Sequence, residues 1–407
     1  MSRVSFLEKL LDGAEVEWLP LGNLGELVRG SGLPKTDFTE TGVPAIHYGQ
    51  IYTFYGLSTT STISFVSPET AENLKKVNKG DVIITNTSEN FEDVGTPVVY
   101  FGEKQAVTGG HATIFKPNDM ISGMYFAYFT QTSEFSSAKR KYAKGAKVID
   151  VSAKDMAKIK IPIPCPNDPR KSLKIQAEIV RILDTFTALT AELTAELTAE
   201  LSARKKQYNY YRDQLLTFPD DDVVWKPLGE LAENLDSKRK PITSGLREAG
   251  DIPYYGASGV VDYVKDYIFD GDLLLISEDG ANLLARNTPI AFSISGKSWV
   301  NNHAHVLKFE TYAERKYIEY YLNSIDLTPY ISGAAQPKLN KKNLNSIKIP
   351  TPSLDEKKRI VDILDKFDAL TNSISDGLPR EIELRNKQYE YYRDLLLNFP
   401  KPMEEAA

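Results

Sequence analysis

The chain has 407 residues, of which 42% are hydrophobic and 26% charged, so its composition is that of an ordinary soluble protein and its length suits two to four domains. A single cysteine, Cys165, excludes an internal disulfide and fits a cytoplasmic location, and one cysteine with four histidines cannot supply a zinc-finger spacing. No apolar run is long enough to span a membrane, and a net charge of −6 argues mildly against nucleic acid as a partner.

The chain begins with an acidic, amphipathic segment, and Trp18 then opens a first repeat unit. Short runs rich in β-branched and aromatic residues follow between glycine, asparagine and aspartate, and they predict strands at residues 61–66, 80–86 and 98–101. A helix is expected at residues 123–129. An Ile-Lys-Ile-Pro sequence at residues 159–162 closes the unit, because prolines at this density end a strand and redirect the chain.

A long amphipathic helix follows this first α+β unit. Apolar residues from Ile179 to Leu215 recur every three or four positions, apart from a gap at residues 204–205, which predicts one helix from about Ser172 to Leu216 with a continuous apolar stripe. Such a helix is about 65 Å long. Residues 190–201 read Thr-Ala-Glu-Leu three times, contain no group able to do chemistry, and are interpreted as a spacer that can change by whole repeats.

The second unit repeats this order from Trp225. The same signals predict strands at residues 272–277, 289–294 and 305–309, a helix at residues 313–322 and a closing Ile-Lys-Ile-Pro at residues 347–350. Its long helix keeps the apolar stripe, but Gly377 and Pro379 interrupt it. Proline inside a helix costs about 3 kcal/mol, so a kink or a restart is expected near Pro379.

The two units match best in their helices. Residues 179–189 (IVRILDTFTAL) correspond to residues 360–370 (IVDILDKFDAL). Residues 207–219 (QYNYYRDQLLTFP) correspond to residues 388–400 (QYEYYRDLLLNFP), and both pairs are separated by 181 residues. A stripe of this length must be covered, and the other unit's helix is its natural cover. We expect antiparallel packing, which would place the two domains at opposite ends of a rod with an approximate two-fold axis. The N-terminal segment also resembles the stretch that joins the first helix to Trp225, so it should complete the helical region at the C-terminus.

Two basic runs occupy matching places in the units, at an offset of 188. Residues 138–160 hold eight Lys and Arg against two Asp, and residues 333–348 hold four Lys and no acid. Either run alone could be an ordinary solvated face, but two basic domains at a fixed distance suit a double helix read at two half-sites.

The chain resembles the specificity (S) subunits of type I restriction–modification enzymes over essentially its full length. The resemblance rests on the duplicated Gln-Tyr-x-Tyr-Tyr-Arg-Asp motif and the TAEL array, and on three segments of the second domain: residues 252–256 (IPYYG), 275–282 (LISEDGAN) and 299–303 (WVNNH). It implies an α+β fold, with two mixed α/β target-recognition domains separated by two long helices that pack as an antiparallel coiled coil with a pseudo-two-fold internal repeat. The expected boundaries are residues 1–15 for an N-terminal segment that completes the C-terminal region, 16–163 and 223–351 for the target-recognition domains, and 164–222 and 352–407 for the central and C-terminal helical regions.

The resemblance also implies a non-catalytic protein. Each target-recognition domain would read one half of a bipartite, asymmetric site in double-stranded DNA. The coil would set the spacer and bind two modification (adenine methyltransferase) subunits, and through them the restriction (translocase and nuclease) subunits, with no membrane involved. No cofactor is expected in this chain, whereas S-adenosylmethionine, ATP and Mg are expected in the partner subunits. In agreement, the sequence has no Asn-Pro-Pro-Phe/Tyr methylation motif and no Gly-x-x-x-x-Gly-Lys-Ser/Thr nucleotide loop.

Candidate site residues follow from these patterns, and none is catalytic or metal-binding. The candidates for DNA binding are Lys139, Arg140, Lys141, Lys144, Lys147, Lys238, Arg239, Lys240, Tyr254, Tyr255, Ser258, Asn282, Lys338, Lys341 and Lys342. The candidates for the coil and for partner binding are Leu189, Leu193, Leu197, Leu201, Tyr208, Tyr211, Ile374, Tyr389 and Tyr392. The two tyrosines 254 and 255 could stack on DNA or pack internally, and Glu278, Asp279 and Asn282 could read bases or form a plain turn. For the matching His111 and His303, we favour a structural role over DNA contact.

Two other functions remain open from the residues alone. The chain could be a coiled-coil scaffold whose domains bind proteins, or it could itself methylate or cut DNA. A steep fall of affinity with salt separates the first from a DNA-binding protein. Incubation of the chain alone with DNA, magnesium and S-adenosylmethionine tests the second.

Overall fold

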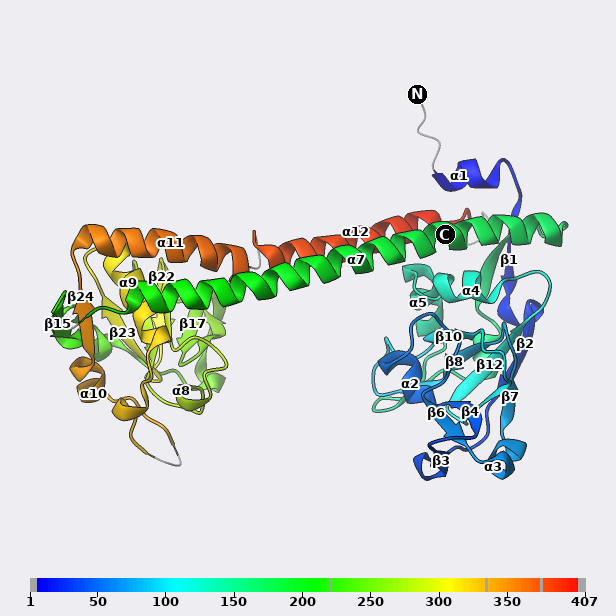
Figure 1. Cartoon of the computed structure of the whole chain (residues 1–407), viewed down its shortest axis with the longest axis horizontal. Helices are drawn as coiled ribbons and strands as arrows, with labels where there is room; N and C mark the ends of the chain where they lie inside the picture. The colour runs from blue at the N-terminus through cyan, green and yellow to red at the C-terminus, as the bar shows by residue number, and fades with distance from the viewer. Residues whose placement is uncertain (1–5, 220, 334–335, 374–375, 402–407) are drawn as a thin grey trace. The chain divides into compact units, whose positions relative to one another are not determined.

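The computed structural model describes residues 6–219, 221–333, 336–373 and 376–401 (Figure 1). The chain forms two compact units: unit 1 comprises Met1–Ala195 with Glu383–Ala407, and unit 2 comprises Glu196–Ile382. Each unit holds a sheet-rich domain and one part of the helix α7 (Pro169–Leu216), which connects the two domains along the sequence. This confirms the predicted long helix, which begins three residues before the expected Ser172.

Unit 1 contains, besides its part of α7, the following elements: α1 (Phe6–Leu11), β1 (Val16–Pro20), η1 (Leu21–Asn23), β2 (Gly25–Arg29), η2 (Lys35–Asp37), β3 (Phe38–Thr39), β4 (Val43–Ile46), α2 (Tyr48–Thr53), β5 (Ser58–Thr59), β6 (Ser64–Val66), α3 (Pro68–Asn73), β7 (Lys75–Val77), β8 (Val82–Thr85), β9 (Thr87–Ser88), β10 (Pro97–Tyr100), β11 (Ala106–Thr108), β12 (Ala112–Pro117), α4 (Gly123–Phe129), α5 (Ser133–Arg140), β13 (Ile149–Asp150), α6 (Ala153–Met156), β14 (Lys160–Pro164) and most of α12 (Leu378–Leu396). Two five-stranded sheets, β2-β12-β8-β10-β5 and β3-β6-β4-β11-β7, form the domain. All four residues of β8 are buried, since both faces of its sheet are covered.

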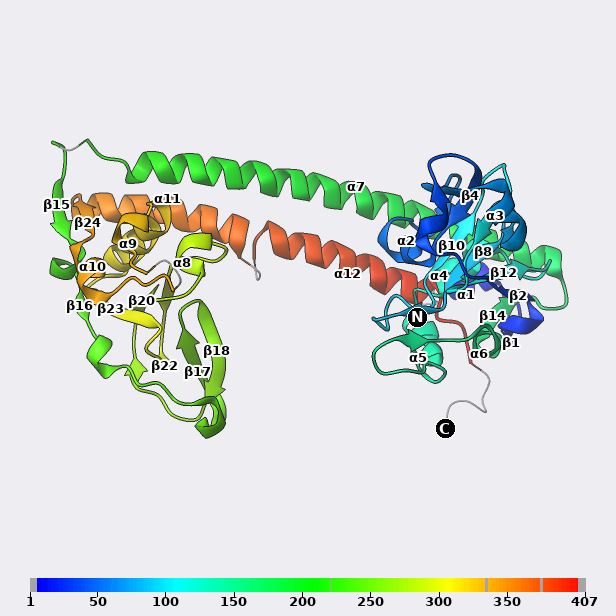
Figure 2. The ribbon, with the colours of Figure 1, turned by 90° about the horizontal axis from the view of Figure 1, so that it is seen from below.

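Unit 2 contains, besides its part of α7, the following elements: β15 (Val224–Pro227), η3 (Leu228–Glu230), β16 (Glu233–Asn234), η4 (Asp236–Lys238), η5 (Ser244–Leu246), β17 (Ala249–Gly256), β18 (Gly259–Val264), β19 (Phe269–Asp270), β20 (Leu273–Ser277), α8 (Asn282–Ala285), β21 (Ala291–Ile294), β22 (Lys297–Val300), β23 (Ala304–Lys308), α9 (Tyr312–Ser324), η6 (Thr328–Tyr330), α10 (Lys341–Ser346), β24 (Lys348–Thr351), α11 (Leu354–Asn372) and the start of α12. Two four-stranded sheets, β16-β23-β20-β21 and β18-β17-β22-β19, repeat the strand order of unit 1, and Figure 2 shows the β17–β18 hairpin. The predicted helices and strands of both domains are confirmed to within two residues at their ends, except that only Ser64–Val66 of the strand predicted at residues 61–66 is formed.

The start and the end of each domain pair with one another. In unit 1, β1 runs antiparallel to β14 with Trp18 opposite Pro162, and in unit 2, β15 runs antiparallel to β24 with Trp225 opposite Pro350. The tryptophan that opens each repeat therefore lies against the Ile-Lys-Ile-Pro sequence that closes it.

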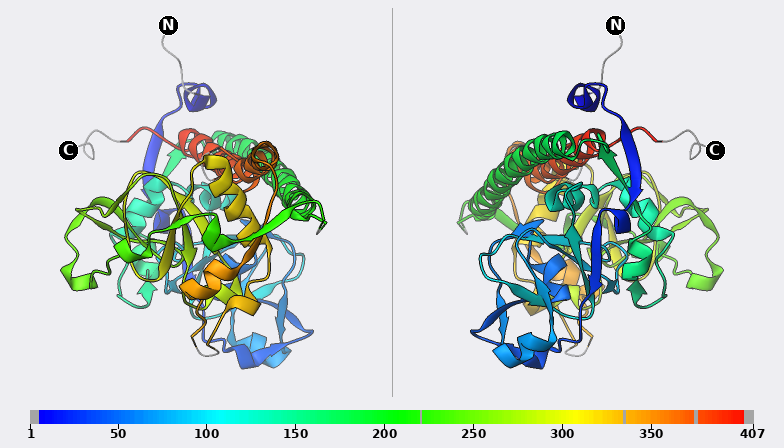
Figure 3. Two further views of the ribbon diagram at one scale, coloured as in Figure 1. Left: turned by 90° about the vertical axis from the view of Figure 1, so that its left-hand side faces the viewer. Right: turned by 90° about the vertical axis from the view of Figure 1, so that its right-hand side faces the viewer.

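One helix of each domain joins the sheets to the long helices. The helices α4 and α9 lie between the sheets and the long helix of their own unit, as the views in Figures 1 and 3 show. The hydroxyl of Tyr128 on α4 donates to Asp184 Oδ1 on α7 at 2.6 Å, and the hydroxyl of Tyr320 on α9 donates to Asp365 Oδ1 on α11 at 2.5 Å. The same residue types in the same places thus attach both domains.

The long helices pack in opposite directions within each unit. In unit 1, Phe186 of α7 lies against Tyr392 of α12, and the next residue, Thr187, is hydrogen-bonded to Tyr389 at 3.0 Å, so later residues of α7 meet earlier residues of α12. In unit 2, the rings of Tyr208 and Tyr211 lie against Phe367 of α11, with centroids 6.4 and 5.7 Å apart.

The interruption of the second helix occurs where it was expected. Helix α11 ends at Asn372 and α12 begins at Leu378, so Pro379 lies in a first turn, where its missing N–H costs little. The candidate coil residue Ile374 lies outside the described residues.

The N-terminal helix packs on the C-terminal residues of the same unit. Leu7 and Leu11 of α1 share a core with Leu397 and Phe399, and the indole N–H of Trp18 donates to the carbonyl of Pro400 at 2.7 Å.

Candidate nucleic-acid interface

In the second domain, several candidate residues meet where β20 ends. Glu278 directly follows this strand, and its carboxylate accepts from Arg239 Nη1 at 2.6 Å and lies 3.1 Å from Lys338 Nζ. Asp279, the next residue, forms a backbone bridge with Lys338. Three segments far apart in the sequence therefore meet at one edge of the sheet, and two of them carry a basic residue there. We call this edge the β20 edge.

At the β20 edge, burial and neighbouring positive groups have opposite effects on the pKa of Glu278. Burial alone would raise the pKa of Glu278, but Arg239, His305 and Lys338 lower it below its ordinary value. His305 is fully buried and holds the segments together, since its ring nitrogens lie 2.6 Å from Asp236 Oδ2 and 2.7 Å from the carbonyl of Leu339. The Lys338 side chain remains half exposed, so the network positions its ammonium without enclosing it.

The other basic candidates of this domain lie on the surface. Lys238 and Lys240 are exposed on either side of Arg239. Lys341 and Lys342 are exposed in the first turn of α10.

The polar and aromatic candidates of the second domain divide into two groups. Ser258 lies exposed in the β17–β18 turn, which reaches the β20 edge because Ser277 Oγ donates to the carbonyl of Ala257 at 2.5 Å. Tyr255 is half-buried beside Phe292. The amide of Asn282 instead bonds the backbone of Thr288 at 3.0 and 3.1 Å, which is the plain-turn role.

Tyr254 is a correction to the candidate set. Its side chain is 1% exposed, its hydroxyl accepts from the N–H of Ile242 at 3.0 Å, and the guanidinium of Arg247 covers its ring. Because its ring is enclosed on the inner side of β17, Tyr254 cannot stack on a base.

In the first domain, the basic run forms a hairpin loop against the equivalent strand end. Lys144 and Asp150 exchange backbone hydrogen bonds of 3.0 and 2.8 Å, and 188 residues later Ser332 and Lys338 do the same at 2.9 and 2.8 Å. The strand β13, which ends this loop, pairs with β9 just after β8. The loop geometry therefore confirms that the two basic runs occupy equivalent places.

The side chains of the first basic run differ widely in exposure. Lys147 and Lys141 are exposed, Arg140 is exposed with its guanidinium 4.1 Å from the ring centroid of Phe91, and Lys144 is exposed beside Asp155, 3.0 Å away.

Lys139 is a second correction. It is 6% exposed, and its ammonium donates to the backbone carbonyls of Phe91 and Val94. This burial lowers the pKa of Lys139 to about 8. Its ammonium fixes the loop after β9 and is not available to a phosphate.

The duplicated helical motif has the same geometry in both units. Tyr210 and Tyr211 are 62% and 40% exposed, and their counterparts Tyr391 and Tyr392 are 64% and 44% exposed. Each pair packs edge to face with centroids 5.4 Å apart. Large aromatic side chains at equivalent exposed positions mark a protein-binding surface more often than a core.

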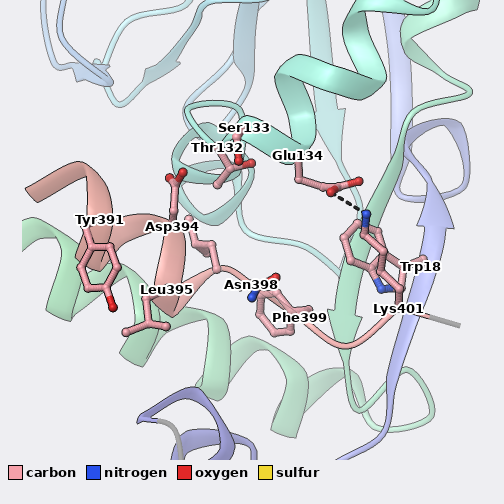
Figure 4. Close-up of a pocket in the computed structure, with 11 residues that line it drawn as sticks. Trp18, Thr132, Ser133, Glu134, Tyr391, Asp394, Leu395, Asn398, Phe399 and Lys401 are labelled. Atoms are coloured by element: carbon pink, nitrogen blue, oxygen red, sulfur yellow. Dashed lines mark ion pairs between the residues drawn. The ribbon is translucent and has the colours of Figure 1, made fainter. Parts of the chain in front are cut away.

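An equivalent cavity lies beside each motif. In unit 1 a cavity of about 310 Å³ lies between the end of α12, Trp18 and the start of α5, where Glu134 pairs with Lys401 at 2.7 Å (Figure 4). In unit 2 a cavity of about 330 Å³ lies between the end of α7, Trp225 and the end of α9. A cavity thus adjoins the helical motif in each unit, and in unit 2 a larger cavity of about 590 Å³, lined by Tyr208 and Arg212, adjoins it as well.

The apolar stripe of α7 is only partly covered. Leu193, Leu197 and Leu201 of the TAEL array are half-buried, while the array's glutamates are exposed. Leu189 is 51% exposed, which corrects the expectation of a fully covered stripe.

A single family model matches the chain twice, once in each repeat. The family model described as the type I restriction modification DNA specificity domain matches residues 14–203 and again residues 220–384. The chain belongs to the type I restriction modification DNA specificity family. Two similar relatives are specificity subunits of Escherichia coli. That of EcoR124I/EcoR124II is 39% identical over 429 residues and covers 99% of both chains, and that of EcoprrI is 36% identical over 388 residues and covers 92% of this chain and 93% of the relative.

Solved structures agree with this assignment at the level of the fold. A chain from work on complex assembly and conformational transition of the type I R-M system has a TM-score of 0.64 at 15% identity, with 94% of this chain and 97% of that chain covered. The HsdS subunit from Thermoanaerobacter tengcongensis has a TM-score of 0.54 at 16% identity, with 94% and 95% covered. The expected mixed α/β fold with two target-recognition domains is confirmed.

As a type I specificity subunit, the chain recognises a DNA sequence and is non-catalytic. Within the described ranges, no cluster of three or more acidic, histidine or cysteine side chains could hold a metal ion. None of the helices described combines the length and the apolar character that crossing a membrane requires.

The sequence reasoning named the two matching histidines but did not identify the residue that each of them contacts. His303 Nδ1 lies 2.9 Å from Asp279 Oδ1, and His111 Nδ1 lies 2.9 Å from Thr87 Oγ1. Both histidines are exposed. The matching Gly-Gly-His-Ala and Asn-Asn-His-Ala sequences carried the signal, but nothing in them showed that the rings lie on the surface.

Proposed function

We propose that the two domains each read one half of a bipartite, asymmetric site in double-stranded DNA. Residues 16–163 and 223–351 are the two reading domains in this proposal. The observation that carries it is the pair of equivalent basic hairpin loops, each beside the end of an equivalent strand, with different side chains around them. Equivalent backbones with different surfaces suit two half-sites of different sequence.

Phosphate contacts come from the exposed basic residues in this proposal, namely Arg140, Lys141, Lys144, Lys147, Lys238, Lys240, Lys338, Lys341 and Lys342. Arg239 contributes through the position it gives to Glu278. Bases are read in the major groove by polar residues around the strand ends, with Ser258 and Tyr255 among them.

The helical regions, residues 164–222 and 352–407 with the N-terminal segment 1–15, set the separation of the half-sites and bind two modification subunits. The equivalent tyrosine pairs and adjoining cavities support two copies of one protein partner, because a partner that fits one fits the other. Restriction subunits join through the modification subunits. The partners supply S-adenosylmethionine, ATP and magnesium for their reactions.

Exchange of one domain tests the proposal. Residues 20–160 are replaced by the corresponding domain of another specificity subunit, and the methylated sites of a genome carrying the protein with its modification subunit are mapped. The expected result is that one half-site changes while the other half-site and the gap stay the same. Two altered half-sites, or none, would refute independent reading.

Salt dependence separates DNA binding from the scaffold alternative. Phosphate contacts make the logarithm of the binding constant fall linearly with the logarithm of salt, by about 0.9 for each phosphate neutralised. A binding constant for duplex DNA that is insensitive to salt would favour the scaffold.

A further inference from the structure

The exposed histidine of each domain is held by the same backbone contact. The N–H of Glu278 donates to the carbonyl of His303 at 2.9 Å, and the N–H of Asn86 donates to the carbonyl of His111 at 2.8 Å. Each histidine stands directly before a central strand, β23 or β12, so its backbone is fixed by the sheet. A rigid support of this kind is what a base-reading side chain needs.

Each histidine also lies next to the basic hairpin loop of its domain. The partner of His303, Asp279, forms a backbone bridge with Lys338. The partner of His111, Thr87, pairs with Asp150 of the other hairpin loop. A domain that anchors its lysines on the DNA backbone therefore brings the histidine toward the groove beside them.

The residue bonded to Nδ1, Asp279 or Thr87, decides whether the other ring nitrogen, Nε2, is a hydrogen-bond donor or an acceptor. The carboxylate of Asp279 only accepts, so Nδ1 of a neutral His303 must carry the hydrogen and Nε2 is left as an acceptor. The hydroxyl of Thr87, unlike a carboxylate, can donate to Nδ1 of His111 as well as accept from it. When it donates, Nε2 carries the hydrogen and is a donor. Neither Nε2 has a hydrogen-bond partner among the residues the structure describes.

We propose that His303 and His111 each read one base in the major groove, and that the residue bonded to Nδ1 sets which kind of base is accepted. With Asp279, the acceptor Nε2 of His303 selects the amino group of adenine or cytosine. With Thr87 donating to Nδ1, the donor Nε2 of His111 selects guanine through O6 or thymine through O4. The proposal rests on DNA reading by the two domains and adds the residues that determine one position in each half-site.

Exchange of the two partner residues tests the proposal. The full-length chain with its modification subunit selects binding sites from a random duplex library, and Asp279→Thr is compared with the wild type. One position of the second half-site is expected to shift from adenine or cytosine toward guanine or thymine by about fivefold to thirtyfold, the range of one base contact. Thr87→Asp is expected to cause the reverse shift in the first half-site.

Two further variants fix the interpretation. Asp270→Thr removes an exposed carboxylate on β19, opposite Lys297 at the start of β22, and should leave both half-sites unchanged. His303→Ala should abolish preference at the same single position. An unchanged half-site in Asp279→Thr, or weaker binding without a change of preference, overturns the proposal. A wild type that selects no bipartite site would instead refute the proposed function. In every second-domain variant, the unchanged positions of the second half-site report that the second domain is folded.

Discussion

Deletion of one TAEL repeat, residues 194–197, tests the role of the helix as a spacer. Helix α7 is continuous across the array, so losing four residues shortens it by about 6 Å and turns its distal part by about 40° beyond a full turn. Leu193 and Leu201 are both half-buried. The two repeats that remain after the deletion therefore still contribute one leucine each to the apolar stripe of the helix. At 3.4 Å per base pair, 6 Å corresponds to about one to two base pairs.

The expected result is a recognition site whose gap is one to two base pairs shorter and whose half-sites are unchanged. The measurement is methylation mapping with the modification subunit present, and insertion of one repeat should lengthen the gap by the same amount. Glu196→Gln, which changes an exposed side chain but not the length, serves as the control. An unchanged gap after deletion, or altered half-sites, would refute the spacer role.

Three other predictions follow from single contacts. Lys341→Gln with Lys342→Gln should weaken binding to all DNA sequences alike, and the slope of the logarithm of the binding constant against the logarithm of salt should become about 2 less steep. The control Lys358→Gln on α11 should have neither effect. A change in sequence preference would contradict phosphate contact. Tyr320→Phe removes a buried hydrogen bond to a carboxylate and should lower the free energy of unfolding of unit 2, measured by denaturant titration, by about 1.5–3 kcal/mol. Tyr312→Phe, which removes an exposed hydroxyl bonded to the same Asp365, should lower it less. Equal effects of the two substitutions would count against the importance of the buried hydrogen bond. Burial lowers the pKa of Lys139 to about 8 from 10.5, so between these pH values the unfolded state binds one proton more than the folded state. The free energy of unfolding should therefore rise with pH across that window, by up to about 1.4 kcal/mol per pH unit. Lys139→Met should lack this rise, and thermal-unfolding profiles of the two proteins that run parallel with pH would refute the prediction.

The helices were predictable because their signals are local. The three- and four-residue spacing from Ile179 onward, and the interruption at Pro379, depend on neighbours in the sequence. The duplication then indicated which helices pair, because an apolar stripe has to be covered. Sheet order was not predictable, since the parallel pairing of β17 with β22 joins segments more than forty residues apart without a local signal.

The candidate site shows a similar limit. The two basic runs were found from charge and offset, but a run does not show which side chain turns inward, so the buried Lys139 was grouped with its exposed neighbours. In the same way, a Tyr-Tyr pair on a strand has one residue inside and one outside, and the sequence does not tell which. The sequence named His303 but did not show which residues surround it, because these come from three distant segments.

The attachment of each domain through a tyrosine hydroxyl and an aspartate of the long helix bears on how such proteins diversify. The contact is made at the same place in both units, and none of it involves the β20 edge or the equivalent end of β8 in unit 1. A gene segment for one domain can therefore recombine with another at the shared helical sequences and still dock correctly. New sequence preferences would then arise by shuffling whole domains in evolution, without a compensating change in the frame that carries them.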